Sequence, residues 1–299
     1  MIRTLYNGID FRIKGLLGRM NRFFYKEPRI LSSVKSLDTL IDGKKSIARF
    51  GDGEFKLMRG GNLGFQKYDE KLAKRLFEVL KFQNPQLEIG LPKVFGSLKE
   101  YKEDSARFWR AYLGENRRWI MKQIDQSKIY LNTNMTRFWS GYKVDLNLCE
   151  EIIKKYKKIW DGRDIIFIEG KFTRMGVGND LFDNAKSIRR ILCPAENSWG
   201  SYPEILSNVK KVVAENRDAL YILALGPTAT VLAYDLCVGG GIQALDLGHL
   251  DVQYEYYILR AEKKIALAGK YVNEVEEGRN ITDSIIDQEY KNSIILEIE

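Results

Sequence analysis

The 299-residue chain is poor in cysteine, in histidine and in long apolar runs, and these shortages exclude several classes of protein. Cys149, Cys193 and Cys237 are widely spaced within apolar segments, which indicates buried, reduced thiols rather than a disulfide framework or a zinc site. No apolar run is long enough for a transmembrane helix, and we expect no signal peptide. We therefore expect a cytoplasmic protein.

Short motifs of the common nucleotide-binding and nucleic-acid-binding proteins are also missing. Gly176-Val177-Gly178 lacks the third glycine and the strand-to-helix spacing of a dinucleotide fingerprint, so no nicotinamide cofactor is expected. Basic residues are mixed with acidic ones along most of the chain, and we expect no nucleic-acid partner. The net charge of +8 still favours an anionic partner, such as a phosphorylated small molecule or a membrane surface.

Residues 9 to 26 predict a basic amphipathic helix, because apolar side chains recur at helical spacing and basic side chains fill the remaining faces. The apolar positions are Ile9, Ile13, Leu16, Leu17, Met20, Phe23 and Phe24, and the basic ones are Arg12, Lys14, Arg19, Arg22 and Lys26. Such a helix packs on its own domain or on a second subunit. The alternative is a peripheral contact with the inner face of the membrane. We assign residues 1–30 to this helix and 31–299 to one further domain.

The second half of the chain alternates between short apolar runs and helical stretches. Apolar runs occur at 128–132, 164–168, 188–193, 219–225 and 242–247, and helical patterns at 147–160 and 203–215. This alternation is typical of parallel βα units. It predicts an α/β domain with a mostly parallel sheet flanked by helices, and a ligand crevice at the carboxyl ends of the strands.

The first candidate site follows an apolar run at residues 46–50. Gly51 and Gly53 allow the chain to turn there, and Asp52 and Glu54 lie beside them. Two carboxylates at the exit of a strand suit a hard divalent cation such as Mn²⁺ or Mg²⁺. An Asp-Gly pair is also an ordinary turn, so the pattern alone leaves both interpretations open.

Two further turns are candidates for binding a phosphate. Gly226-Pro227-Thr228 begins a predicted helix, whose free N–H groups would face an anion. Lys171 and Arg174 place two cations in one loop, where they could neutralise a leaving phosphate. A helix start without a ligand and a solvated basic loop are the alternatives. We add Gly51 and Gly176, at two of these turns, to the residues expected to bind the donor.

The chain's single histidine, His249, follows the apolar run at 242–247. A lone histidine is also common as a structural residue, but its position after a strand favours a ligand. If a helix begins near Asp251, then Asp251 and Glu255 lie on one helical face beside it. One imidazole and several carboxylates would then converge.

Several of these segments, in this order, resemble the GT-D type glycosyltransferases, a family formerly described as a domain of unknown function. The resemblance covers roughly residues 45–260 and is carried by Arg49 to Glu54, Glu169 to Phe182, Cys193 to Asn197, Ala224 to Ala229 and Gly248 to Asp251. It implies a Rossmann-like fold, a nucleotide-sugar donor and a manganese-type ion held partly by Asp52 and Glu54. Gln253 departs from the acid expected at its position, so it receives no catalytic role.

The combined expectation is a metal-dependent transferase that moves a hexose, first of all glucose, from a UDP-sugar to a glycoprotein or lipid-linked glycan during surface polysaccharide or glycoprotein assembly. We expect the metal at Asp52, Glu54 and His249, and the general base at Glu255, with Asp251 as the second candidate. A non-catalytic nucleotide-binding partner, a metal-dependent phosphohydrolase and a homo-oligomer remain open.

Overall fold

In the computed structural model, which describes residues 2–279, 281 and 288–299 and side chains from residue 11 onward, nine strands form one sheet. The order is β1-β4-β3-β2-β8-β7-β5-β6-β9, and every pairing between neighbours is parallel. The strands are β1 (Arg29–Ile30), β2 (Ser46–Arg49), β3 (Leu87–Leu91), β4 (Ile129–Asn132), β5 (Asp164–Gly170), β6 (Ser187–Cys193), β7 (Leu220–Ala224), β8 (Ala244–Asp246) and β9 (Ile294–Glu297). The predicted parallel α/β fold is confirmed.

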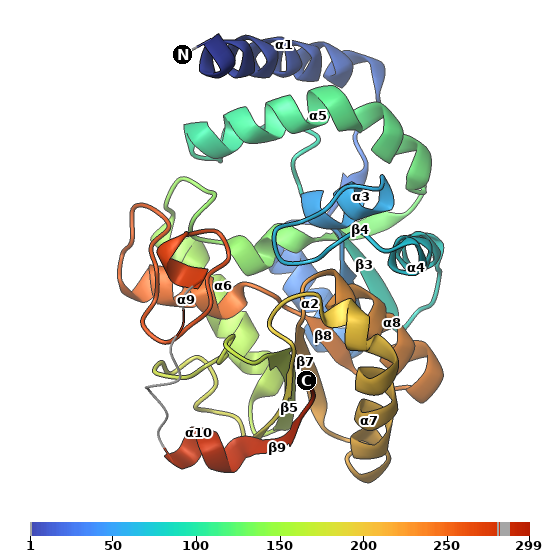
Figure 1. Ribbon diagram of the computed structural model, residues 1–299, viewed down its shortest axis with the longest axis vertical. Helices are drawn as coiled ribbons and strands as arrows, with labels where there is room; N and C mark the ends of the chain where they lie inside the picture. The colour runs from blue at the N-terminus through green and yellow to red at the C-terminus, as the bar shows by residue number, and fades with distance from the viewer. Residues whose placement is uncertain (1, 280, 282–287) are drawn as a thin grey trace.

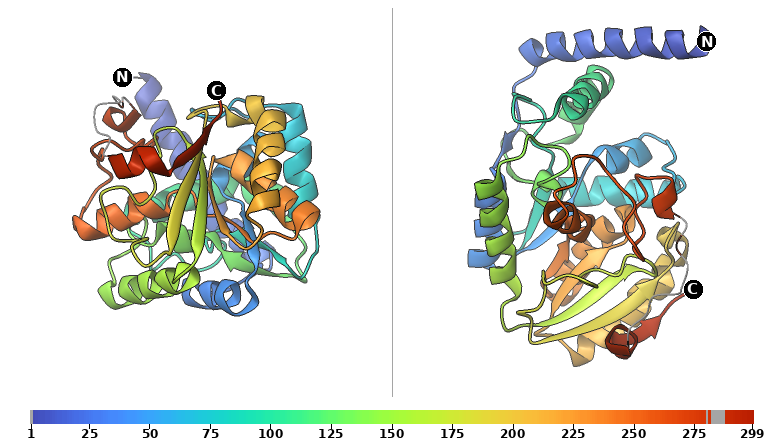
Figure 2. Two further views of the ribbon diagram at one scale, coloured as in Figure 1. Left: turned by 90° about the horizontal axis from the view of Figure 1, so that it is seen from below. Right: turned by 90° about the vertical axis from the view of Figure 1, so that its left-hand side faces the viewer.

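Helices cover both faces of this sheet (Figures 1 and 2). The helices are α1 (Ile2–Phe24), α2 (Ser33–Gly43), α3 (Asp52–Met58), α4 (Glu70–Lys81), α5 (Glu103–Gln123), α6 (Leu146–Trp160), α7 (Tyr202–Glu215), α8 (Pro227–Gly240), α9 (Leu250–Ile258) and α10 (Gln288–Ser293). Side chains of α4, α5, α7 and α8 pack into one core, and those of α2, α6 and α9 into the other.

Strand β5 shows how the sequence serves both cores. Ile166 and Ile168 point into the first core, while Ile165 and Phe167 point into the second, and all four side chains are fully buried. Successive side chains of a strand face opposite sides of the sheet, so a strand covered on both faces must be apolar throughout. This is why the continuous apolar run identified the strand.

Three strands were not predicted: β3, β9 and the two-residue β1. Strand β3 contains a glutamate and a glycine, which are depleted in strands and weaken the apolar pattern. Strand β9 lies at the edge of the sheet beside β6, and only its alternate residues are shielded from solvent. The turn predicted after β2 is also shorter than expected, because α3 begins directly at Asp52.

The predicted amino-terminal helix is present as α1 and packs across α5, on the far side of α5 from the sheet (Figures 1 and 2). The crossing is close at two glycines: a Cβ atom on Gly18 would lie 2.0 Å from the carbonyl oxygen of Arg110, and one on Gly114 would lie 1.9 Å from that of Lys14. Within the part of the chain that the structure describes, no helix combines the length and apolar character needed to cross a membrane.

Candidate active site

A cavity of about 850 Å³ opens at the carboxyl ends of the strands. It is lined by residues that follow seven of the strands, β2 to β8, among them Asp52, Pro92, Asn134, Thr173, Ala195, Gly226 and His249. The start of α5 and the segment from Glu262 to Arg279 complete its walls. The location is that of ligand sites in open parallel sheets, and it brings the candidates Gly51, Asp52, Glu54, Gly226 and His249 to one space.

Asp52 and Glu54 lie in the first turn of α3, where the free N–H groups of a helix favour negative charge. Asp52 is exposed to the cavity, whereas Glu54 is partly shielded and its Oε2 accepts a hydrogen bond of 2.7 Å from the N–H of Gly51. Burial, together with the nearby charge of Asp246, raises the pKa of Glu54 to about 7. A cation bound beside Glu54 would favour its ionised form.

An ion pair between Arg49 and Asp246 forms the floor of the cavity beneath these acids. Arg49 Nη2 lies 2.8 Å from Asp246 Oδ1, and Arg49 Nη1 donates to Thr136 Oγ1 over 2.7 Å. Thr230 adds hydrogen bonds to the carbonyl oxygen of Arg49 and to Asp246 Oδ2. The floor therefore ties β2, β8 and α8 together.

Gly248, beside this pair, has a φ of +46°, and a Cβ atom there would lie 2.2 Å from Arg49 Nη2. Both facts require glycine: the backbone conformation disfavours a side chain, and the guanidinium occupies its space.

His249 lies in the cavity wall with both ring nitrogens in contact with neighbours. Nδ1 is 3.3 Å from Arg137 Nη2, and Nε2 is 3.1 Å from Asn273 Oδ1. Because a guanidinium can only donate, these partners assign the ring hydrogen to Nε2. Burial and the charge of Arg137 lower the pKa of His249 to about 4. A metal bound to this ring would have to displace one of the two hydrogen bonds, so contact through water fits the structure better.

The amino terminus of α8 points to the cavity at Gly226, as predicted for a phosphate site. Gly226 has a φ of +55°, and a Cβ atom there would lie 2.7 Å from the Phe65 ring. Pro227 and Thr228 form the first turn of α8, and neither lines the cavity; the Thr228 side chain is fully buried. Only the glycine of this motif therefore lies in the cavity wall.

The predicted donor-binding residues of the other phosphate loop lie away from the cavity. Lys171 is 2.6 Å from Glu297 in an ion pair, and Arg174 is buried with its Nη1 donating to the carbonyl oxygen of Gly269 over 2.9 Å. Gly176 donates its N–H to Asp251 Oδ1 over 2.9 Å. None of the three lines the cavity, so the structure does not support their assignment to donor binding. Gly170 and Thr173, at the start of the same loop, do line it.

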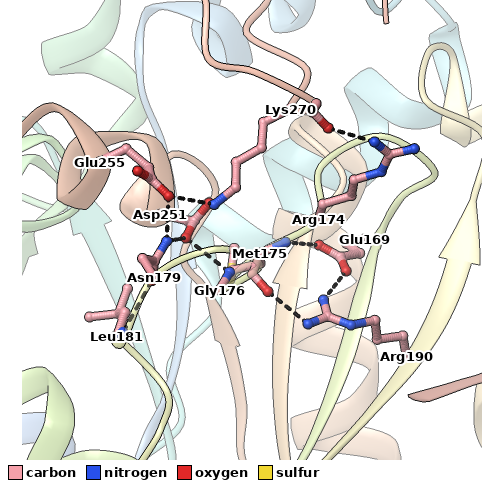
Figure 3. A network of polar contacts seen from close by, with 11 residues as sticks. Glu169, Arg174, Met175, Gly176, Asn179, Leu181, Arg190, Asp251, Glu255 and Lys270 are labelled. Carbon is pink, nitrogen blue, oxygen red and sulfur yellow. Dashed lines mark hydrogen bonds and ion pairs between the residues drawn. The ribbon is translucent and has the colours of Figure 1, made fainter. Parts of the chain in front are cut away.

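Asp251 and Glu255 belong to a buried network that holds this loop in place (Figure 3). Lys270 Nζ lies 2.6 Å from Asp251 Oδ2 and 2.9 Å from Glu255 Oε1, and Asn179 Nδ2 donates to both carboxylates. Burial disfavours the charged ammonium, but the two carboxylates outweigh that effect and raise the pKa of Lys270.

This network corrects the assignment of the general base. Neither carboxylate lines the cavity, and both are already bound by a buried lysine, so neither is placed to take a proton from a substrate there. Sequence reasoning placed Asp251 and Glu255 correctly on one face of a helix. It could not show that Lys270, from a segment with no recognisable pattern, occupies that face.

Among the described residues, no three His, Cys, Asp or Glu side chains are gathered closely enough to hold a metal ion by themselves. The donor set at Asp52 and Glu54 is instead the kind that binds Mg²⁺ or a similar ion through one or two carboxylates, with substrate phosphates and water completing the coordination. The two acids fit such an ion only together with a phosphorylated substrate.

Several cavity residues were not identified from the sequence. Arg137 Nη1 lies 2.6 Å from Glu274 Oε1, and Lys264 Nζ lies 3.0 Å from Glu274 Oε2. Burial opposes ionisation of Glu274, but the charge of Arg137 outweighs it and holds the pKa of this carboxyl far below its usual range. These residues come from a short 3-10 helix and an irregular segment, where no periodicity marks a functional residue.

Known glycosyltransferases are similar to this chain over most of its length. A family model described as the glycosyltransferase GT-D fold matches residues 47–275. The chain is 38% identical over 268 residues to the "Probable glycosyl transferase Gly" of Streptococcus gordonii, and 31% identical over 265 residues to "Glycosyltransferase GlyD" of Streptococcus pneumoniae serotype 4. These alignments cover 89% and 88% of this chain but 38% and 32% of those proteins, so the chain spans well under half the length of either relative.

Solved structures are similar over nearly the whole chain. One of them has a TM-score of 0.85 and is 34% identical, and the match covers 97% of this chain and 100% of that one. It is described as showing that the highly conserved domain of unknown function 1792 has a distinct glycosyltransferase fold. A new glycosyltransferase of the same domain class from Streptococcus sanguinis matches with a TM-score of 0.83 at 33% identity, covering 91% and 100%.

Proposed function

Because this chain belongs to the family of glycosyltransferases with the GT-D fold, we propose that it transfers a hexose from a UDP-sugar to a glycan acceptor with the help of Mn²⁺ or Mg²⁺. Glucose is the first sugar to test. The observation that carries this proposal is the meeting of Asp52, Glu54 and the amino terminus of α8 in one cavity at the strand ends. We further propose a cytoplasmic role in surface polysaccharide or glycoprotein assembly.

Asp52 and Glu54 are the residues that would hold the metal. When bound, the ion neutralises charge on the diphosphate as it leaves the sugar. Asp52 is exposed to the cavity, and Glu54 is fixed by its hydrogen bond to Gly51. His249 lies in the same wall and would act through water or by orienting the diphosphate.

Binding of the diphosphate is supported by two groups of the chain itself. The first turn of α8 offers backbone N–H groups and the positive end of the helix dipole at Gly226. Arg137, in the wall beside His249, adds a cation that Glu274 orients. Groups fixed in advance in this way stabilise charge that develops during the reaction.

The acceptor would enter beside α5. Phe108 lines that end of the cavity with 42% of its surface exposed, and Trp109 lies next to it, which together offer apolar ring faces to a sugar. Three carboxylates of the cavity wall, Asp104, Glu196 and Glu262, replace Glu255 as candidates for the general base. Of these, Asp104 lies on the same helix as the two aromatic residues.

A thermal-shift screen of nucleotide sugars, with and without Mn²⁺, tests donor binding. A ligand present at one hundred times its Kd stabilises the folded protein by about 2.7 kcal/mol. We expect UDP-glucose with Mn²⁺ to raise the Tm, and Asp52→Asn and Glu54→Gln to abolish that rise. If turnover of the bound donor needs no sugar acceptor, the protein is a phosphohydrolase, and if bound donor is never turned over, it is a binding partner.

A further inference from the structure

Helix α1 presents its apolar side to solvent rather than to the protein. Large side chains at i, i+3 and i+4 spacing are exposed along it: Ile13 by 54%, Leu16 by 59%, Leu17 by 44%, Met20 by 49%, Phe23 by 88% and Phe24 by 76%. We call these six residues the α1 apolar stripe. A helix that packs on its own domain turns its apolar side inward, so this orientation is the reverse of the ordinary one.

The side of α1 that contacts α5 is made of small and polar residues instead. Gly18 meets α5 at Gly114, Asn21 Nδ2 donates to the carbonyl oxygen of Gly114 over 3.2 Å, and Lys14 Nζ lies 3.1 Å from Glu115 Oε2. These contacts fix the rotation of α1 about its own axis. The outward direction of the apolar stripe is therefore built into the packing.

A second cavity, of about 600 Å³, lies between α1, the start of α5 and the segment 94–101. Its wall carries six cations and one acid: Arg19, Arg22, Lys99, Arg110, Arg117 and Lys143, against Glu103. Glu103 is already paired with Arg110 over 2.5 Å, and nearby Glu27 lies 3.4 Å from Arg22. The cavity thus has an excess of positive charge beside the apolar stripe.

Arg117 in this wall is a buried cation whose charge is not matched by a carboxylate in hydrogen-bonding contact. It is 1% exposed, its Nη2 donates to the carbonyl oxygen of Phe95 over 2.7 Å, and its Nε has no hydrogen-bond partner among the described residues. Burying a charge is expensive unless it is paired, so an anion in the cavity would satisfy this guanidinium.

We propose that α1 and this cation-lined cavity together form a binding surface for a membrane of anionic phospholipids. The apolar stripe inserts among the acyl chains near the headgroups, and the cavity receives a lipid phosphate at Arg117. Arg12 and Arg19 flank the stripe and face the negatively charged surface, and Arg22 lies in the wall of the cavity. The helix lies in the plane of the membrane surface.

Charge favours a membrane over a second copy of this chain as the occupant. A twofold pair would bring the same patch of each copy together, and with it the same basic flank. The cations would then repel one another, whereas an anionic surface attracts all of them. The proposal concerns binding alone and does not depend on the donor or the metal of the proposed transferase.

The test is flotation of the full chain with vesicles of phosphatidylglycerol and, separately, of phosphatidylcholine. We expect binding to phosphatidylglycerol that weakens as salt is added, and much weaker binding to phosphatidylcholine. Arg19→Gln with Arg22→Gln should weaken binding roughly 25-fold, because each cation near an anionic surface contributes about fivefold. Leu16→Ser with Met20→Ser should weaken it by about tenfold or more per residue. Val238→Ser, which alters an exposed apolar residue of α8 (41% exposed), is the matched control and should bind like the parent.

Arg117→Gln tests the cavity itself, with its Tm measured in parallel. Should that variant fail to fold, Lys99→Gln with Lys143→Gln changes two exposed cations of the same wall instead. Loss of phosphatidylglycerol binding by a folded cavity variant, either Arg117→Gln or Lys99→Gln with Lys143→Gln, supports the proposal. Equal binding to both lipids, or unchanged binding by the cavity and stripe variants, overturns it. It is also overturned if the parent is a dimer that Leu16→Ser with Met20→Ser converts to a monomer.

Discussion

Replacing Lys270 by methionine should destabilise the protein without removing a catalytic group. The ammonium is 5% exposed and lies within 3 Å of Asp251 and Glu255, whose side chains are 2% and 16% exposed. Removing one partner of a buried ion pair costs about 3–5 kcal/mol, because the remaining charges stay buried. For a chain of this length a loss of 1 kcal/mol lowers the Tm by about 1.6 °C. We therefore expect a decrease of about 5–8 °C.

Glu255→Gln separates this structural role from the catalytic role predicted from the sequence. Glutamine keeps the shape and an acceptor for Asn179 or Lys270, so the Tm should fall less than in Lys270→Met, by about 2–5 °C if a charged hydrogen bond is worth about 1.5–3 kcal/mol. Transfer well below the Tm should stay within about threefold of the parent. Removing a general base would instead slow transfer by about 10²- to 10⁴-fold.

Calorimetry on the two variants, together with initial transfer rates at 25 °C, decides between these roles. A double-mutant cycle should give a coupling between Glu255 and Lys270, since the two side chains are in contact. The reasoning fails if Glu255→Gln keeps the parental Tm and loses transfer by two orders of magnitude. In that case Glu255 would be the base after all.

Three further changes probe the site and its supports. Gly248→Ala should displace Arg49 from Asp246 and weaken UDP binding in calorimetry, whereas Gly178→Ala, also at positive φ but with open space around it, should affect only stability. Arg190→Met leaves the fully buried Glu169 unpaired and should cost about 3–5 kcal/mol in urea unfolding, while Lys74→Met, in an exposed pair, should change nothing measurable. Burial and Arg137 lower the pKa of His249 from 6.5 to about 4, so the unfolded chain binds this proton first as pH falls. Stability should therefore drop between about pH 6.5 and 4, and His249→Asn should flatten that drop; an equal slope in parent and variant would contradict it.

The sequence predicted those parts of the fold that periodicity encodes. Strand β5 is apolar throughout because both faces of the sheet are covered there. Helix α6 carries an apolar stripe because one of its sides is buried. Strand β3 and the edge strands β1 and β9 lack such patterns and were missed. The amphipathic helix was predicted correctly, but its pattern could not show which side faces α5, since that depends on the glycines of both helices.

The candidate site was predictable where function follows directly after a strand. Gly51, Asp52, Glu54, Gly226 and His249 all line the cavity, because parallel strands place their carboxyl ends at one edge of the sheet. Lys171 and Arg174 lie a few residues further along a loop, and there the path of the chain is set by tertiary contacts such as the one to Gly269. Distance from the strand end is thus what limited the prediction.

The most direct test of the proposed site is the binding of Mn²⁺ measured by electron paramagnetic resonance with and without UDP. The account predicts weak binding of the ion alone, since Asp52 and Glu54 supply two carboxylates and a bound diphosphate supplies the further oxygens, and much tighter binding when UDP is present. Asp52→Asn with Glu54→Gln should abolish the UDP-dependent binding, whereas Lys270→Met, assayed below its Tm, should retain it. If the double variant binds Mn²⁺ and UDP as tightly as the parent, the metal and the diphosphate lie elsewhere and the proposed site is wrong.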